Sequence, residues 1–220
     1  MDIKVGNGAF MKDEKEAIIL GNYLKNVAEK FDIKMKYSIT DMNQPLGNQA
    51  GLICEVIESI ETLKGNGPND LLKVVSHLAN ECLTLAGIDN GMQKIEKVIN
   101  NGKAYEKFEK MIIAHGGDIS SIKLNPSITK IIKAEKEGYL NFNNTKSLGM
   151  SIIELGGGRK KIDDIVDSNA GFRLIKKHGS YVNKDDEIAE IFCSDNNKIE
   201  KGVLTFKKSI EIINQLPNNY

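Results

Sequence analysis

Tryptophan is absent from this chain of 220 residues, and proline, cysteine and histidine are scarce, with four, three and three copies. The cysteines, Cys54, Cys82 and Cys193, are far apart and form no CxxC pair. The sequence therefore indicates neither a disulfide framework nor a zinc site. A reducing cytoplasm is the simplest setting for such a protein.

An excess of charge of one sign is lacking as well, because 30 basic and 30 acidic residues cancel to a net charge of 0. No overall field favours nucleic acid or an anionic membrane, although a local anion site needs only local donors. No apolar run approaches the roughly 18–20 residues of a membrane-spanning helix, and the N-terminus does not have the pattern of a signal peptide. We expect a soluble intracellular protein of two domains, without nucleic-acid or membrane partners.

The N-terminal part of the sequence predicts a βαβ unit. A strand ends near Val5, and a helix begins at Asp13, which has the capping-box spacing to Glu16. This helix is expected to end near Phe31, and an alternating run over residues 34–39 predicts the second strand. Because helical crossovers join parallel neighbours, the two strands are expected to pair in parallel.

The middle of the chain is predicted to be mostly helical. Apolar spacing favours a helix over 53–60 that stops at the Gly-Asn-Gly-Pro run of 65–68. Asp70 is interpreted as the cap of the next helix, and two further helical pieces are predicted within 91–114.

After residue 126 the pattern changes to short apolar runs separated by glycine and asparagine, which predicts a small, mainly β domain. The runs are ITKIIKA, GYLNF, MSIIEL, GFRLIKK and EIAEIF. A closing helix is predicted over KIEKGVLTFKKSIEIINQL, with Val203, Phe206, Ile210 and Ile213 on one side. The predicted fold class is α/β: a partial parallel-sheet domain with a helical middle region (1–126), followed by a small, mainly β, α+β domain (127–220).

A loop follows each of the two predicted parallel strands. Gly6 and Gly8 free the backbone to approach a ligand, although from the pattern alone a tight strand-to-helix turn with Phe10 in the core is the favoured interpretation. In the second loop, TDMNQPLG (40–47), Asp41 and the carbonyl groups suit a hard cation or simply a turn. Since parallel strands end at one edge of a sheet, both loops are expected to open on the same side.

Four segments together resemble the pyrimidine-nucleoside phosphorylase family, thymidine phosphorylases included. DIKVGNGAFMK is similar to the family's DxKxGxGAFM, and ITDMNQPLG to its (I/S)(T/S)DM(N/S)QPLG. EVIESIETLKGNGPNDL is similar to EVxEAxxxLxGxGPxDL, and GGGRKKIDDIVDSNAGFRLIKKHG to GGGRxxxxDxID…VG…KxG. The order and spacing of these segments are kept over nearly the whole chain.

The resemblance implies reversible phosphorolysis, in which a pyrimidine nucleoside and phosphate give the free base and a pentose 1-phosphate. Family members have a helical and an α/β domain with the substrates between them, and they usually form homodimers. Their phosphate is held by a KHSTGGVGD-like stretch, and the base by an Arg and a Ser/Lys pair, all upstream of DxKxGxGAFM. None of these motifs occurs in the 220 residues. We therefore expect the C-terminal half of such an enzyme, without catalytic residues of its own and with little activity alone.

Carried over position by position, the resemblance leaves four candidate site residues. Phe10 corresponds to the aromatic residue that lines the apolar side of the base pocket. Leu46 and Gln49, through their carbonyls, and Glu58, through its carboxylate, correspond to potassium ligands of bacterial members. Such oxygens suit a hard cation, although by pattern alone Glu58 is an ordinary solvated helix charge. Gln49 stands where a small residue is usual, and Leu52 where Asn is common.

Other residues are given structural interpretations. His77 is interpreted as a helix-face residue, and His115 and His178, which precede glycine, as helix-end or turn residues. The GGGR run of 156–159 lacks the Lys-Ser/Thr of a P-loop. The C-terminal domain also resembles a barrel-sandwich hybrid of the biotinyl or lipoyl kind, but no lysine sits in an MKM-like hairpin. Two alternatives stay open: a non-catalytic complementing subunit or remnant of a split gene, and a carrier-type domain.

Overall fold

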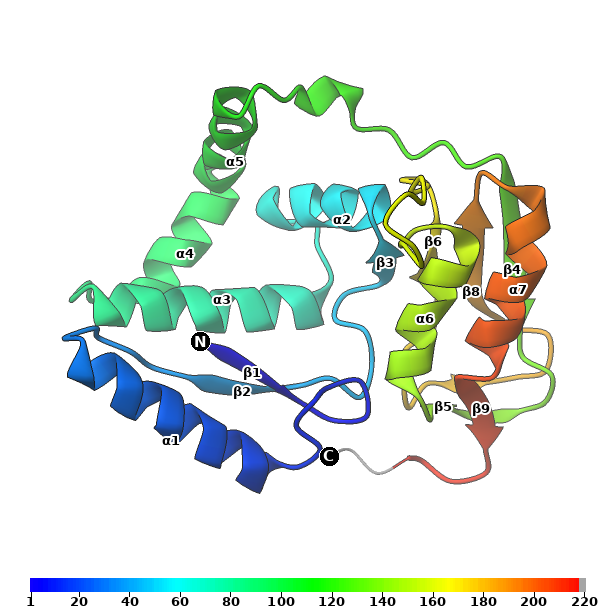
Figure 1. Cartoon of the computed structure of the whole chain (residues 1–220), viewed down its shortest axis with the longest axis horizontal. Helices are drawn as coiled ribbons and strands as arrows, with labels where there is room; N and C mark the ends of the chain where they lie inside the picture. Colours follow the sequence, from blue (N-terminus) through cyan, green and yellow to red (C-terminus); the bar gives the residue numbers. More distant parts are fainter. Residues whose placement is uncertain (218–220) are drawn as a thin grey trace. The chain divides into compact units, whose positions relative to one another are not determined.

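A computed structural model describes residues 1–217 (Figure 1). The chain divides into two compact units, one formed by residues 1–42 and 59–121 and the other by residues 43–58 and the chain from 122 onward. Sequence patterns place a domain boundary after residue 126, whereas the units divide after residue 121. In the structure, the segment 43–58 also belongs to the unit of the C-terminal residues.

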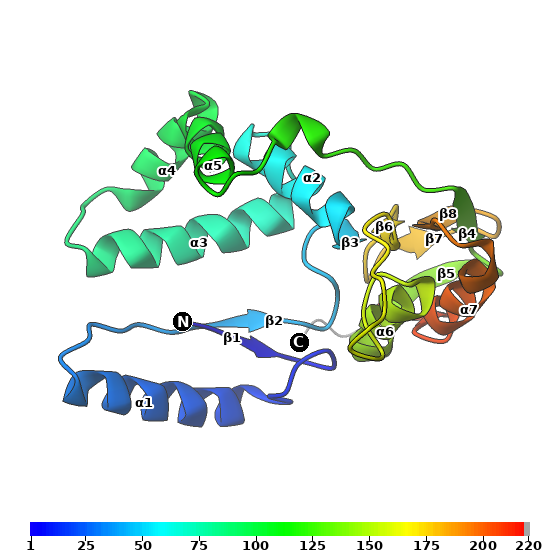
Figure 2. The same ribbon diagram turned by 45° about the horizontal axis from the view of Figure 1, so that its top comes forward.

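The first unit opens with the expected βαβ arrangement, β1 (Asp2–Val5), α1 (Glu14–Lys30) and β2 (Ser38–Asp41). The two strands pair in parallel, as predicted, with Asp2 opposite Ser38, and α1 runs alongside them (Figure 2). The prediction of a second strand over 34–39 is wrong at its start. Since β1 begins at Asp2, residues 34–37 have no strand opposite them in the described chain.

Helix α1 begins as the sequence predicts. The Asp13 carboxylate accepts a hydrogen bond from the Glu16 N–H at 2.9 Å, and the Glu16 carboxylate accepts one from the Lys12 N–H at 3.4 Å. These bonds satisfy N–H groups that the helix leaves unpaired at its start. The helix buries Ala17 on its inner face and ends at its C-cap, Phe31.

The predicted helices of the middle region are confirmed, but Asp70 is not a cap. The N-cap of α3 is Pro68, and Asp70 lies in the first turn, where its carboxylate accepts a hydrogen bond from the Leu71 N–H. An acidic residue in this turn also interacts favourably with the positive end of the helix dipole. Within residues 1–217, no helix combines the length and apolarity needed to cross a membrane. The elements of this region are α2 (Ile53–Leu63), α3 (Asn69–Leu85), α4 (Gly91–Asn100), α5 (Lys103–Ala114) and the 3₁₀ turn η1 (Ile119–Ser121).

The second unit consists mainly of two antiparallel sheets, with strand orders β3-β6-β8-β4 and β7-β5-β9. This confirms the α/β fold class with a small β-rich C-terminal domain. Its elements are β3 (Gln49–Gly51), β4 (Ile128–Lys133), β5 (Gly138–Phe142), α6 (Thr145–Leu155), β6 (Gly171–Leu174), β7 (Tyr181–Val182), β8 (Glu187–Cys193), α7 (Asn196–Lys207) and β9 (Ile210–Ile213).

Two elements of this unit differ from the sequence prediction. The run MSIIEL belongs to helix α6, because Asn144 caps its start by accepting from the Ser147 N–H and Gly156, in the left-handed conformation (φ 99°), ends it. The closing helix stops at Lys207, and residues Ile210–Ile213 form β9 on the edge of β5. Their β-branched side chains suit a strand wherever an edge is available.

The core of the second unit lies between the sheets and the two helices. Phe172 of β6 and Phe206 of α7 meet edge to face, with ring centroids 5.1 Å apart. Both are almost fully buried, as are Leu148 and Leu155 of α6. This packing holds α6 and α7 against the sheets, and Ala50 of β3 packs against the same core.

Replacing Phe206 by alanine is expected to lower the free energy of unfolding by about 3–5 kcal/mol, because it removes a buried ring and leaves a cavity. Urea denaturation measures the change. Leu204→Ala in the same helix is the matched control, since Leu204 is 54% exposed, and it should change the free energy by about 0.5 kcal/mol or less. Equal losses in the two variants would contradict the described packing.

Candidate functional site

The two loops predicted at the edge of the parallel strands begin side by side. The Gly8 N–H donates to the Met42 carbonyl at 3.0 Å, and the Met42 N–H donates to the Val5 carbonyl at 2.7 Å. Phe10, in the first loop, is 97% exposed, so the alternative that makes it a core residue is wrong. Its role in a base pocket stays a prediction.

Glu58 is the buried acid of the candidate site. Glu58 lies on α2 and only 8% of the residue is exposed. The interpretation of Glu58 as an ordinary solvated helix charge is therefore wrong. Its two carboxylate oxygens accept hydrogen bonds from successive backbone N–H groups, Asn48 at 2.9 Å and Gln49 at 3.3 Å. The structure thereby brings together two of the predicted cation ligands, Gln49 and Glu58.

The backbone of Gln49 is oriented by the register of β3 against β6. The Leu174 N–H donates to the Asn48 carbonyl at 2.6 Å, and Gln49 stands opposite Arg173. Hydrogen-bonded and non-bonded pairs alternate in antiparallel sheets, so Gln49 and Arg173 form a non-bonded pair. The carbonyl of Gln49 therefore points away from β6, on the same side as its N–H, which reaches Glu58.

Leu46 lies in the bend before β3, between two residues that share one cationic partner. The ammonium group of Lys177 donates to the carbonyl of Pro45 at 2.7 Å and to that of Gly47. Sequence reasoning missed Lys177. The one available signal was the family-like KxG pattern that contains it, and that pattern says nothing about a partner 130 residues away.

The residues present fit a hard monovalent cation. The carboxylate of Glu58 and the backbone carbonyl of Gln49 are oxygen donors, which such a cation prefers. Among residues 1–217 there is no group of three or more His, Cys, Asp or Glu side chains able to hold a metal ion. A cation bound near Glu58 would need further oxygen ligands, such as the backbone carbonyl of Gln49.

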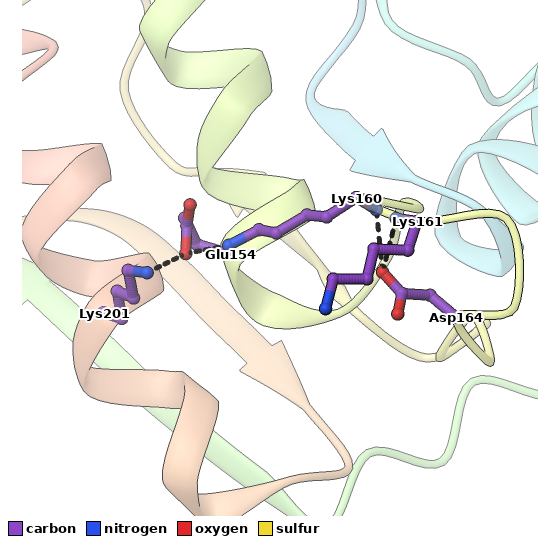
Figure 3. Close-up of polar contacts among 5 residues, drawn as sticks. All are labelled: Glu154, Lys160, Lys161, Asp164 and Lys201. Carbon is purple, nitrogen blue, oxygen red and sulfur yellow. Dashed lines mark hydrogen bonds and ion pairs between the residues drawn. The ribbon is translucent and has the colours of Figure 1, made fainter.

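The GGGR run of 156–159 leads into a loop in which Lys160, Lys161 and Asp164 form hydrogen bonds within the domain (Figure 3). The Glu154 carboxylate accepts from the ammonium groups of Lys160 at 2.6 Å and Lys201 at 2.9 Å. Asp164 accepts from the backbone N–H groups of Lys160 and Lys161, both at 2.9 Å. The hydrogen bonds from Lys160 and Lys201 hold the pKa of Glu154 below its usual value.

The three histidines take part in local or structural contacts. Nε2 of His77 is 2.9 Å from Oγ of Ser38, a partner 39 residues away that sequence reasoning missed. His115 contacts the carbonyl of Met111 at the end of α5, and Nδ1 of His178 accepts from the Phe142 N–H. Cys54 is no ready nucleophile, because burial raises its pKa to about 11.

Comparison with known proteins assigns the chain to a class. Residues 139–213 match the model of the pyrimidine nucleoside phosphorylase C-terminal domain. Similar proteins include the thymidine phosphorylase of Metamycoplasma hominis, 37% identical over 93% of this chain and 79% of that protein. The thymidine phosphorylase of Colwellia psychrerythraea is 35% identical over 99% of this chain and 52% of its own length.

A pyrimidine-nucleoside phosphorylase of Bacillus subtilis is 34% identical over 90% of this chain and 48% of its own length. The chain therefore belongs to the family of thymidine and pyrimidine-nucleoside phosphorylases. It spans most of the Metamycoplasma protein that it matches and about half of the other two.

Replacing Glu58 by alanine is expected to lower the free energy of unfolding by about 2–4 kcal/mol, because two backbone N–H groups lose a buried, charged acceptor. Glu58→Gln keeps one acceptor oxygen and should lose about half as much. Urea denaturation measures both. The control is Glu55→Ala, since Glu55 is exposed and its carboxylate accepts a hydrogen bond from the Gly51 N–H. If Glu58→Ala costs no more than Glu55→Ala, the buried carboxylate does not hold the loop.

Glu154 predicts a dependence of stability on pH. Its pKa is lowered in the folded state, so its contribution is present above the unfolded-state pKa and is lost as the pH falls through the folded-state pKa. Glu154→Gln should therefore cost about 1 kcal/mol at pH 7 in low salt and less at pH 3. Urea denaturation at both pH values tests this, with the exposed Glu137→Gln as control. A cost that is the same at both pH values would contradict it.

Proposed function

We propose that this chain is the C-terminal portion of a pyrimidine-nucleoside phosphorylase, a pentosyltransferase that uses phosphate as co-substrate to release the base from a pyrimidine nucleoside. The observation that carries the proposal is the 37% identity with a protein named thymidine phosphorylase over 93% of this chain. The buried Glu58, bound to the loop that leads into Gln49, is consistent with it.

In this proposal the chain supplies Phe10 to the base pocket and Leu46, Gln49 and Glu58 to a potassium site. The phosphate and the developing charge of the sugar need positioned donors and cations. Those groups come from a KHSTGGVGD-like stretch and from the Arg and Ser/Lys pair, which lie in sequence that these 220 residues do not contain. The isolated chain is therefore expected to have little or no activity.

The alternative of a complementing subunit is favoured by the surface of the first unit. Its described sheet has only two strands, and a two-stranded sheet is marginally stable without further packing. Helix α1 also exposes apolar residues at intervals of four, in addition to its buried inner face; these are Ile19, Tyr23, Val27 and Phe31. Such a surface suits an N-terminal polypeptide of the same enzyme.

Further properties follow from the family resemblance and belong to the proposal. The completed enzyme is a homodimer that binds potassium and works in the cytoplasm. The three cysteines are free thiols in the structure, which agrees with a reducing compartment.

Phosphate-dependent release of thymine or uracil from their nucleosides tests the proposal. The purified 220-residue chain should show little or no release. Co-expression with the N-terminal portion of a related phosphorylase, ending before its DxKxGxGAFM motif, should give a complex that is active only with phosphate, and more active in potassium than in choline chloride. Phe10→Ala in that complex should raise the KM for the nucleoside.

Two results would change the proposal. Full activity of the chain alone would overturn the division of the site between two polypeptides. A stable but inactive complex would favour the remnant of a split gene. The DNA upstream of the coding sequence gives a separate check, since KHSTGGVGD and SGRGxxxTGGTxDxxE in the same frame would indicate a longer polypeptide.

A further inference from the structure

The segment 43–49, which we call the cation loop, is held by a lysine that the family-based site does not include. We propose that Lys177 is a positioning residue of the phosphorylase: its ammonium group fixes the backbone on both sides of Leu46, so that the loop keeps the shape in which it binds the ion. This inference rests on the proposed function, because it concerns the potassium site of that enzyme.

The contacts of Lys177 bracket Leu46. Its ammonium group donates to the carbonyl of Pro45 at 2.7 Å and to that of Gly47. Gly47 is in the left-handed conformation, with φ of 71°, and lies in a bend of the chain. Because the carbonyls before and after Leu46 both accept from the ammonium group of Lys177, the carbonyl of Leu46 has little freedom to rotate. Hydrogen bonds from a charged donor are also stronger than neutral ones.

Two neighbouring contacts extend the same support toward the start of the cation loop. The Thr145 hydroxyl, at the start of α6, donates to the carbonyl of Asn43 at 2.6 Å. The His178 N–H donates to the side-chain oxygen of Gln44 at 3.3 Å. Both partners are more than 100 residues away in sequence, so the C-terminal domain shapes a loop that the N-terminal part of the sequence supplies.

The other end of the cation loop is held by Glu58, whose carboxylate receives the N–H groups of Asn48 and Gln49. The ammonium group of Lys177 thus binds carbonyls near the middle of the cation loop, and the carboxylate of Glu58 binds N–H groups at its end. A potassium ion that binds carbonyls of this loop has its ligands arranged before it arrives, which reduces the ordering cost of binding.

A positively charged lysine near a cation site has an opposite effect as well, because like charges repel. When the charge of Lys177 is removed, positioning and repulsion predict opposite changes in the affinity for potassium. If positioning dominates, Lys177→Met weakens the binding of potassium. If repulsion dominates, the same substitution strengthens it.

The first test needs no enzyme activity. Amide hydrogen exchange of the 220-residue chain is compared among wild type, Lys177→Met, Lys177→Arg and the control Lys176→Met. Lys176 is the adjacent half-buried lysine, and its backbone N–H bonds to Ile188. In Lys177→Met the amides of Asn48 and Gln49 should exchange about tenfold faster or more, while those of β8 keep their rates. Lys177→Arg should restore slow exchange, because its guanidinium can reach two carbonyls.

The second test uses the active complex with the N-terminal portion. The potassium concentration that gives half-maximal phosphorolysis should rise about tenfold in Lys177→Met, as for other residues that orient metal ligands. The rate at saturating potassium should change much less, and Lys176→Met should resemble wild type.

Unchanged amide exchange rates in the cation loop of Lys177→Met overturn the inference. Exchange rates that rise equally in the loop and in β8 also overturn it, since they would indicate general destabilisation. A potassium requirement that is unchanged or lower in Lys177→Met overturns it as well. An inactive complex counts against the proposed function alone, because the exchange experiment still decides whether Lys177 holds the loop.

Discussion

The candidate site depends on one buried carboxylate. Glu58 carries a charge into a largely buried position on α2, and an unpaired charge there would be costly. Its compensation is local and specific, since the N–H groups of Asn48 and Gln49 point at its two oxygens. The same two bonds fix where the loop enters β3, and the pairing of β3 with β6 then turns the Gln49 carbonyl outward. The shape of the cation loop therefore follows from satisfying Glu58.

The C-terminal domain supports that arrangement. Its aromatic and aliphatic core holds α6 and α7 against the sheets, and Thr145 and Lys177 reach from this rigid base to the cation loop. Loop side chains alone cannot give such precision, because each ordered backbone residue costs about 1–2 kcal/mol of conformational entropy. In the proposed potassium site, these contacts would let the C-terminal domain determine how well the ligands of the ion are arranged.

Elements specified by neighbouring residues were predictable from the sequence, and elements that depend on distant partners were not. Helix α1 was found because Asp13 and Glu16 lie three residues apart, and the parallel pairing followed from the crossover. The residues of β9 were assigned to a helix because their strand partner, β5, is about 70 residues away. Glu58 was found through family resemblance, but its hydrogen bonds, and the whole role of Lys177, arise from tertiary contacts that no periodicity reveals.

The two units differ in how complete they are on their own. The second unit has two sheets of four and three strands and a continuous core, whereas the described sheet of the first unit is a single parallel pair. Parallel strands are normally covered on both faces, yet α1 leaves a row of apolar side chains in solvent. A surface of this kind is stable when another polypeptide covers it. In the proposed enzyme, the same association would also bring the phosphate-binding groups of the family to this chain, so completion of the fold and completion of the active site would be one event.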